Sequence, residues 1–293
     1  MTDARPRSRP RPSGAPSTPA APTSTVGDVV IGRQSLRVSD SGGGGVPLLL
    51  VNGLGANLEM WAPLRRVLGG RRTIAFDAPG TGGSTTPPIP RSIPGLAALT
   101  VALTDALEVP EFDLLGFSFG GAIAQQIAHD HPERVHRLVL ASTTCGWGAT
   151  PGDPLAFLTL LARAPVALLP PIQQSLQALT GDDAGPDAFS TSDDAWRRRP
   201  PNPLGYWWQL LAAAGWSSWL WLPKLRTPTL VLAGGHDRLA PPANARLLDR
   251  RLPDSTLTVF PEAGHFFLLA DDPTPVARVI CEFLDAATPV PTG

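Results

Sequence analysis

The pentapeptide GFSFG, Gly116 to Gly120, places a serine in the pattern Gly-x-Ser-x-Gly. It follows the apolar run FDLLGF and precedes an alanine-rich segment, so Ser118 is expected where a strand turns into a helix. A turn this sharp needs glycine-sized neighbours and holds the serine hydroxyl clear of the sheet. The context favours a nucleophilic serine, and a small residue in a glycine-rich turn is the alternative.

A serine hydroxyl needs a base that takes its proton and an acid that orients the base. The chain has five histidines, all after Ser118: His129, His131, His136, His236 and His265. The first two point to nearly opposite sides of the predicted helix that starts at the serine, and His136 and His236 are expected in a loop or at a strand edge. His265, in PEAGHFFLL, follows the last predicted strand and is the predicted base, with a buried structural histidine as the alternative.

The acid is expected in a loop that follows another strand. In AGGHDRLAPP, Asp237 comes directly after the predicted strand of residues 227–235. An aspartate there could also be an ordinary helix cap or turn former. The other position for an acid, after the strand of residues 136–142, reads TTCGWG and contains no carboxylate. Asp237 is therefore the predicted acid.

Attack on a carbonyl creates an oxyanion, which preorganised main-chain N–H groups must stabilise. One donor is expected from Phe119, the residue after the serine. The second is expected from Leu54 in NGLGAN, which follows the apolar run PLLLV. Together these residues predict nucleophilic chemistry on a carbonyl compound.

The elements that must position these residues alternate along the chain. Strand-like apolar runs cover residues 46–53, 72–80, 112–118, 136–142, 227–235 and 255–261. Helical patterns between most of them cover residues 96–107, 120–130, 242–252 and 274–286. This alternation predicts an α/β fold with a mostly parallel sheet and helices on both faces.

Composition divides the chain into a core and three other segments. Residues 1–26 are rich in Pro and Arg, have almost nothing to bury, and lack the apolar run of a signal peptide, which predicts a disordered tail. Residues 145–223 contain no clear strand and are predicted to form an inserted helical cap. The predicted core comprises residues 27–144 and 224–287, and residues 288–293 are a second tail.

Length and charge exclude several classes of protein. At 293 residues and 43% hydrophobic content, the chain suffices for one large domain with an insertion. A formal net charge of −1 gives no surplus for binding nucleic acid, and no apolar run is long enough to span a bilayer. Cys145 and Cys281 lie far apart without a CxxC motif, so no disulfide framework or zinc site is expected, and a cytoplasmic location fits.

No cofactor is predicted from the glycine-rich motifs. FDAPGTGGS, with Asp77, Gly80 and Gly82, departs from the dinucleotide-binding pattern because Thr85 stands where the third glycine should be. The only lysine, Lys224, has no glycine-rich loop before it, which excludes a Walker A loop. The segment is interpreted as a turn at the rim of the sheet, and neither a metal nor an organic cofactor is expected.

Several motifs in a fixed order carry a resemblance to a known family. With VNGLGANLEMWAPL, IAFDAPGTGGS, GFSFGGAIAQQIAHDHPERVHRLVLAST, PTLVLAGGHDRLAPPANARLL and AGHFFLL, the chain resembles the α/β-hydrolase superfamily over about residues 28–284. NGLGAN and GYWWQLLAAAGW are more particular. They make the chain most similar to the intracellular poly(3-hydroxyalkanoate) depolymerases of the medium-chain-length type.

The resemblance implies a serine nucleophile at Ser118, an acid at Asp237 and a base at His265. It also implies an apolar ester or polyester substrate and the surface of a polyester granule as a partner in the cytoplasm. Phe119 stands where these depolymerases carry Trp, and Asn52 stands where many hydrolases of this fold carry His. Because the donors to the oxyanion are main-chain groups, neither difference removes a donor, and the change at Phe119 bears on substrate preference more than on mechanism.

Five tryptophans crowd into the second half of the predicted cap: Trp207, Trp208, Trp216, Trp219 and Trp221. Their spacing fits packing along one face of a helix, which is one interpretation. The other is that large apolar rings line a concave substrate site. Trp208 and Trp216 are predicted to bind substrate in this way.

We therefore expect a serine carboxylic-ester hydrolase that works through an acyl-enzyme, with poly(3-hydroxyalkanoate) or its oligomers as substrate. A small-ester esterase, a perhydrolase or a C–C hydrolase stays open, because fold and triad do not select the substrate. Dehalogenases and epoxide hydrolases would normally need Asp where this chain has Ser118. A non-catalytic ligand-binding protein is the alternative from another class, and the presence of all three triad candidates disfavours it.

Overall fold

A computed structural model describes residues 24–156, 158 and 190–286. The predicted tail at 288–293 and most of the tail predicted at 1–26 lie outside these residues, as do residues 157 and 159–189 of the predicted cap. Among the described helices, none is long and apolar enough to cross a membrane.

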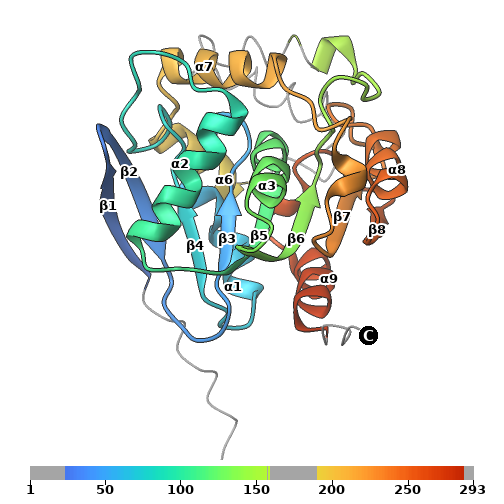
Figure 1. Cartoon of the computed structure of the whole chain (residues 1–293), viewed down its shortest axis with the longest axis horizontal. Helices are drawn as coiled ribbons and strands as arrows, with labels where there is room; N and C mark the ends of the chain where they lie inside the picture. The colour runs from blue at the N-terminus through green and yellow to red at the C-terminus, as the bar shows by residue number, and fades with distance from the viewer. Residues whose placement is uncertain (1–23, 157, 159–189, 287–293) are drawn as a thin grey trace, which may run out of the picture.

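An eight-stranded sheet forms the centre of the molecule, in the order β1-β2-β4-β3-β5-β6-β7-β8 (Figure 1). The strands are β1 Thr25–Ile31, β2 Gln34–Asp40, β3 Leu48–Val51, β4 Thr73–Phe76, β5 Phe112–Phe117, β6 Val135–Ala141, β7 Thr229–Gly234 and β8 Ser255–Phe260. Strands β3 to β8 are parallel, and the β1–β2 hairpin joins them antiparallel through β4. The predicted mostly parallel sheet is confirmed.

Helices cover both faces of this sheet. They are α1 Ala62–Val67, α2 Ile93–Ala106, α3 Phe119–Asp130, α8 Pro242–Arg251 and α9 Thr274–Asp285. Leu49 and Val51 of β3 face the hydrophobic cluster that contains α2, α3 and α8, whereas Leu48 and Leu50 face the cluster that contains α1 and α9. This two-residue alternation between covered faces explains why β3 is apolar at every position.

Helices also make up the described elements between β6 and β7. They are α6 Ser190–Arg198, α7 Pro203–Ala214 and the short 3-10 helix η2 Leu222–Lys224. Asn202 caps α7, because its side-chain oxygen accepts hydrogen bonds from the main-chain N–H groups of Leu204 and Gly205. In Figure 1, α7 lies across the end of the sheet toward which the parallel strands run.

The amino-terminal hairpin differs from the prediction. Strand β1 begins at Thr25, so the boundary predicted after residue 26 falls two residues inside the sheet. The hairpin turns at Gly32, whose φ of 59° favours glycine. The antiparallel pair of β1 and β2 was not predicted, because both strands carry many polar residues and lack the continuous apolar runs of the buried strands.

Candidate active site

Ser118 occupies a strained turn between β5 and α3. Its φ of 51° and ψ of −115° lie in a region that residues with side chains rarely adopt. A Cβ atom at Gly120 would come within 2.1 Å of the Val51 carbonyl oxygen, and one at Gly116 within 2.5 Å of the Gly120 carbonyl oxygen. Both glycines of the motif are therefore required by the close approach of the backbone.

The structure brings Ser118, His265 and Asp237 together in one chain of hydrogen bonds. His265 Nε2 lies 3.0 Å from Ser118 Oγ. His265 Nδ1 lies 2.9 Å and 2.8 Å from the two carboxylate oxygens of Asp237. His265 and Asp237 are each 3% exposed. These distances suit proton transfer from the serine to an imidazole that a carboxylate orients.

The loop after β7 fixes the carboxylate of Asp237. Its Oδ1 accepts hydrogen bonds from the main-chain N–H groups of Leu239, at 2.9 Å, and Ala240, at 2.8 Å. Asp237 is thus a turn former as well as the partner of His265, so the two interpretations of this residue are compatible. The turn holds the carboxylate in place without help from the histidine.

The loop after β8 holds the imidazole of His265. Ser142, at the end of β6, donates its hydroxyl hydrogen to the main-chain oxygen of His265 at 3.0 Å. The imidazole also packs against Phe117 and Phe266, with ring centroids 5.4 Å and 5.1 Å away. All five histidines lie in the described part of the chain, and His129, for example, stacks on Trp221 instead. His265 is the one that contacts the serine hydroxyl.

Leu54 and Phe119 both line the pocket beside Ser118. Phe119 is the first residue of α3, so its N–H group has no acceptor within the helix. Within the described residues, the N–H of Leu54 also has no acceptor. The loop that carries Leu54 is closed by two hydrogen bonds, from Ala56 N to the Gly53 oxygen and from Asn52 Nδ2 to the Asn57 oxygen. The role of the Leu54 and Phe119 N–H groups as donors to an oxyanion stays a prediction.

An apolar pocket of 220 Å³ opens above Ser118. Its walls include Met60, Phe119, Trp196, Leu210, Ala213, Trp216, Leu239 and Leu269. Of the described residues that line it, none carries an Arg, Lys, Asp or Glu side chain. Among the same described residues of the chain, no group of three or more His, Cys, Asp and Glu side chains is placed to hold a metal ion. The pocket therefore suits an uncharged, largely apolar ligand.

The two cap tryptophans singled out in the sequence lie in different surroundings. Trp216 lines the pocket, and its indole N–H donates to Gln126 Oε1 at 2.9 Å. Trp208 is not among the described residues that line this pocket; it lies beside Pro79, Pro87 and Leu96, and its indole N–H donates to the Pro87 oxygen at 3.1 Å. The geometry therefore places only Trp216 beside the serine.

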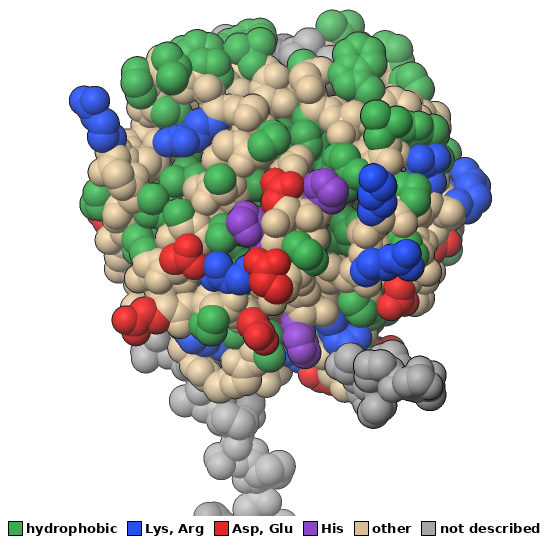
Figure 2. Space-filling view, viewed as in Figure 1, with side chains coloured by type: hydrophobic (Ala, Val, Ile, Leu, Met, Phe, Trp, Pro, Cys, Tyr) green, Lys and Arg blue, Asp and Glu red, His purple; other side chains and the backbone are tan. Residues whose placement is uncertain are grey.

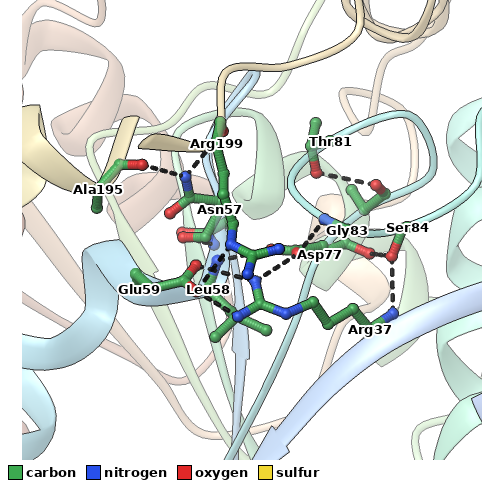
Figure 3. A network of polar contacts seen from close by, with 12 residues as sticks. Arg37, Asn57, Leu58, Glu59, Asp77, Thr81, Gly83, Ser84, Ala195 and Arg199 are labelled. Carbon is green, nitrogen blue, oxygen red and sulfur yellow. Dashed lines mark hydrogen bonds and ion pairs between the residues drawn. The ribbon is translucent and has the colours of Figure 1, made fainter. Parts of the chain in front are cut away.

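A polar network beside the site was missed in the sequence (Figure 3). Buried Asp77 accepts hydrogen bonds from Leu58 N and Gly83 N, each at 2.7 Å, and from Arg37 Nη1 at 3.1 Å. Burial raises the pKa of the Asp77 carboxyl, and the hydrogen bonds from Gly83, Leu58 and Arg37 oppose this effect. Arg37 also pairs with Glu59. The FDAPGTGG segment thus braces the loop after β3, which agrees with its interpretation as a rim turn.

Comparison with known proteins places this geometry in a family. Residues 46–272 match the family model described as alpha/beta hydrolase fold. The chain is 41% identical to a poly(3-hydroxyalkanoate) depolymerase of Ectopseudomonas oleovorans, over 81% of this chain and 84% of the relative. It is 30% identical to a 2-hydroxy-6-oxo-2,4-heptadienoate hydrolase of Pseudomonas putida, over 83% of this chain and 91% of the relative.

Solved structures agree with the sequence relatives. The crystal structure of a hydrolase from Pseudomonas aeruginosa PA01 superposes with a TM-score of 0.73 at 25% identity, covering 89% of this chain and 98% of that one. The strand order, the turn at Ser118 and the matched residues all point the same way. The chain belongs to the α/β-hydrolase family and is a hydrolase.

Proposed function

We propose that this hydrolase cleaves carboxylic esters through an acyl-enzyme on Ser118, and that its substrate is intracellular poly(3-hydroxyalkanoate) or its oligomers. The observation that carries the proposal is the continuous hydrogen-bonded chain from Ser118 through His265 to Asp237 at the floor of an apolar pocket. A serine, a base and an acid in this arrangement are the recurring machinery of acyl transfer.

In the first half of the reaction, Ser118 Oγ adds to the ester carbonyl carbon while its proton passes to His265 Nε2. The carbonyl oxygen becomes an oxyanion, which accepts hydrogen bonds from the N–H groups of Leu54 and Phe119. The bond from the carbonyl carbon to the alcohol oxygen then breaks, and His265 returns the proton to that oxygen. The alcohol leaves and the acyl group stays on Ser118.

In the second half, a water molecule adds to the acyl carbon and gives one proton to His265. The bond to Ser118 Oγ breaks, and His265 protonates the serine, so that a carboxylic acid leaves. Asp237 holds the imidazole in one orientation and stabilises its charged form in both halves. The hydrogen bonds from Leu239 and Ala240 keep the carboxylate fixed while the imidazole changes charge.

The lining of the pocket supports an apolar ester as the substrate. Most of the wall residues are aliphatic or aromatic, with hydroxyl groups from Ser142, Thr143 and Thr144, and the described part of the lining offers no Arg or Lys for an anionic substrate. The relative that shares 41% identity is named as a poly(3-hydroxyalkanoate) depolymerase. Figure 2 shows apolar side chains gathered at the top of the molecule, and exposed Leu204, Trp207 and Leu211 belong to α7. Such a surface fits contact with an insoluble polyester granule.

The relative named for a 2-hydroxy-6-oxo acid raises a second candidate, the hydrolysis of such an acid. An acid of this kind carries a carboxylate, and a buried carboxylate needs a cation or several hydrogen-bond donors. The described lining of the pocket holds neither Arg nor Lys, and the hydroxyls of Ser142 and Thr143 already donate to the main-chain oxygens of His265 and Ser118. A neutral ester is therefore favoured.

The test uses purified protein, p-nitrophenyl esters with acyl chains of about two to ten carbons, and a suspension of poly(3-hydroxyalkanoate). We expect turnover of the esters, release of soluble hydroxy acids from the polymer, and covalent labelling of Ser118 by a fluorophosphonate. Hydrolysis of the p-nitrophenyl esters without hydrolysis of the polymer would indicate a small-ester esterase and would overturn the polyester as substrate. Absence of turnover on every ester would overturn the proposal.

A further inference from the structure

Two cap helices hold the loop that carries Leu54. The N–H of Gly55 donates to Gln209 Oε1 of α7 at 2.9 Å, in a buried position. Asn57 Nδ2 donates to the main-chain oxygens of Ala195, at 2.8 Å, and Arg199, at 3.0 Å, at the end of α6 (Figure 3). The loop after β3 is therefore hydrogen-bonded to residues far away in the sequence as well as to the core.

The ends and the middle of this loop are restrained by different groups. Asn52 Nδ2 donates to the Asn57 oxygen within the loop, Leu58 N donates to Asp77 Oδ1 of the core, and α6 accepts from Asn57, so the ends are held by the loop itself, the core and α6. The middle of the loop includes Leu54 and Gly55. Among the described residues, its side-chain partner from outside the loop is Gln209 of α7.

The residues on either side of Leu54 are flexible, so the hydrogen bond between Gly55 and Gln209 is needed to restrain this part of the loop. Leu54 stands between two glycines, which restrict the backbone less than other residues do. Gly55 has a φ of 69°, and a Cβ atom there would lie 2.7 Å from the ring of Tyr206. The Gly55 N–H belongs to the peptide unit that follows Leu54. A hydrogen bond to that N–H therefore limits rotation directly beside the Leu54 donor.

The environment of Gln209 argues against a role in packing alone. Its side chain is 3% exposed, and its Nε2 has no hydrogen-bond partner among the described residues. A buried polar atom without a partner costs roughly 1–3 kcal/mol, and an apolar side chain of similar size would avoid that cost. The Oε1 atom must face Gly55, because the partner there is an N–H donor.

We propose that Gln209 is a positioning residue for ester hydrolysis: through Gly55, it orients the N–H of Leu54 toward the oxyanion. The proposal rests on the proposed function, since an oxyanion must form at Ser118. The cap then contributes to the chemical step as well as to the walls of the pocket. A donor displaced by a fraction of an ångström binds the transition state less well while substrate binding changes little.

The experiment compares Gln209→Leu, Gln209→Met and Gln209→Glu with the wild type on a soluble ester. Leu cannot accept a hydrogen bond from the Gly55 N–H and the Met sulfur accepts only weakly, whereas a Glu oxygen accepts well. We expect the Leu and Met variants to lose about 10- to 100-fold in kcat with KM within about twofold, as expected for a misplaced donor. We expect the Glu variant to recover most of that loss. Arg198→Ala, at an exposed position of the neighbouring cap helix α6, is the control and should leave kcat unchanged.

A second readout separates positioning from stability. A trifluoromethyl ketone adds to Ser118 and places an oxyanion where the reaction would form one, so its affinity should fall by the same factor as kcat. Unchanged kcat and unchanged ketone affinity in a folded Gln209→Leu or Gln209→Met variant would overturn the positioning role, even if the melting temperature fell. A wild type that hydrolyses no ester would instead overturn the proposed function.

Discussion

The two ends of strand β5 carry polar residues with opposite surroundings. Ser118, directly after the carboxyl end, contacts His265, which is held in turn by Asp237. Asp113, at the amino end, is 2% exposed, and its Oδ1 has no hydrogen-bond partner in the described part of the chain. Its other oxygen lies 3.5 Å from Arg71 Nη1. One strand thus holds a fully connected site at one end and an incompletely paired carboxylate at the other.

The direction of the strands explains this difference. Loops that leave β3, β5, β7 and β8 all emerge at the carboxyl edge of the parallel sheet, and each contributes a group to the site. Crevices outside the carboxyl ends of strands are where α/β sheets bind ligands. At the amino edge, Asp113 is covered by neighbouring chain segments, and burial raises the pKa of its carboxyl to about 6. Asp113 is thus as buried as His265 and Asp237, but within the described residues it is not hydrogen-bonded to a reactive side chain. Burial by itself therefore does not identify a catalytic site.

The largest loss is expected at the serine. Ser118→Ala removes the hydroxyl proposed as the nucleophile while the small alanine side chain fits the same turn, so we expect kcat on esters to fall by about 10⁴- to 10⁶-fold. The melting temperature should stay close to that of the wild type. The measurement is turnover of a p-nitrophenyl ester together with fluorophosphonate labelling, which should disappear. Turnover retained by a folded Ala variant would show that Ser118 is not the nucleophile.

A slightly smaller loss is expected at the acid. Asp237→Asn keeps the shape of the turn but cannot stabilise the charged imidazole, so we expect kcat to fall by about 10⁴-fold. His265→Ala should cost nearly as much as the loss of the serine, because the three residues act as a unit. His236→Ala is the matched control and should change kcat by less than about twofold. Equal damage from His236→Ala and His265→Ala would contradict the assignment of the base.

A loss that depends on the substrate is expected at the pocket wall. Trp216→Ala removes an aromatic side chain from the wall of the pocket. We expect kcat/KM for an ester with a ten-carbon acyl chain to fall by about 10- to 100-fold more than kcat/KM for an acetate ester. This ratio corresponds to the free energy gained by burying a large apolar group. Trp208→Ala, outside the described lining, should affect every chain length equally. The melting temperatures of both variants show how much of each loss in kcat/KM comes from weakened packing of the fold. Equal losses at all lengths in Trp216→Ala would argue against contact with the acyl chain.

Much of the site could be predicted from the sequence, because its signals are local. Glycines two positions before and two positions after Ser118, and an acid and a histidine each in the loop that follows an apolar run, are visible in short windows. The parallel sheet then brings the ends of those runs together. The hairpin of β1 and β2 carries a weaker local signal: two runs of mixed polarity joined by a two-residue loop that contains Gly32.

The contacts between the cap and the loop after β3 could not be predicted in this way. Gln209 and Gly55 are 154 positions apart, and neither stands in a motif that names the other as its partner. The same holds for Asn57, whose partners lie at the end of α6. Such pairs depend on where the cap helices pack against the loops of the sheet. The periodicity of apolar residues along the chain does not predict that position. The surroundings of Trp208 differ from the expectation for the same reason.

The smallest effect on activity is expected at the amino end of β5, where the effect on stability depends on pH. The charged groups around Asp113 are Arg71, Arg137, His136 and Asp285, and desolvation outweighs the attraction of the cationic ones. The pKa of the carboxyl is about 6 in the folded state and 3.8 without the fold. Folded protein therefore binds this proton more tightly, so the wild type loses stability as the pH rises from about 4 through 6.

Asp113→Asn removes this titration and should leave kcat unchanged, since the residue lies at the far edge of the sheet from Ser118. One pKa unit corresponds to about 1.36 kcal/mol. The free energy of unfolding of the variant minus that of the wild type should therefore rise by up to about 3 kcal/mol from pH 4 to pH 7. Urea unfolding of both proteins at several pH values measures this difference. A difference that stays constant from pH 4 to pH 7 would show that Asp113 is ionised in the folded protein as readily as in the unfolded chain, and that the two ends of β5 differ less than their hydrogen bonds indicate.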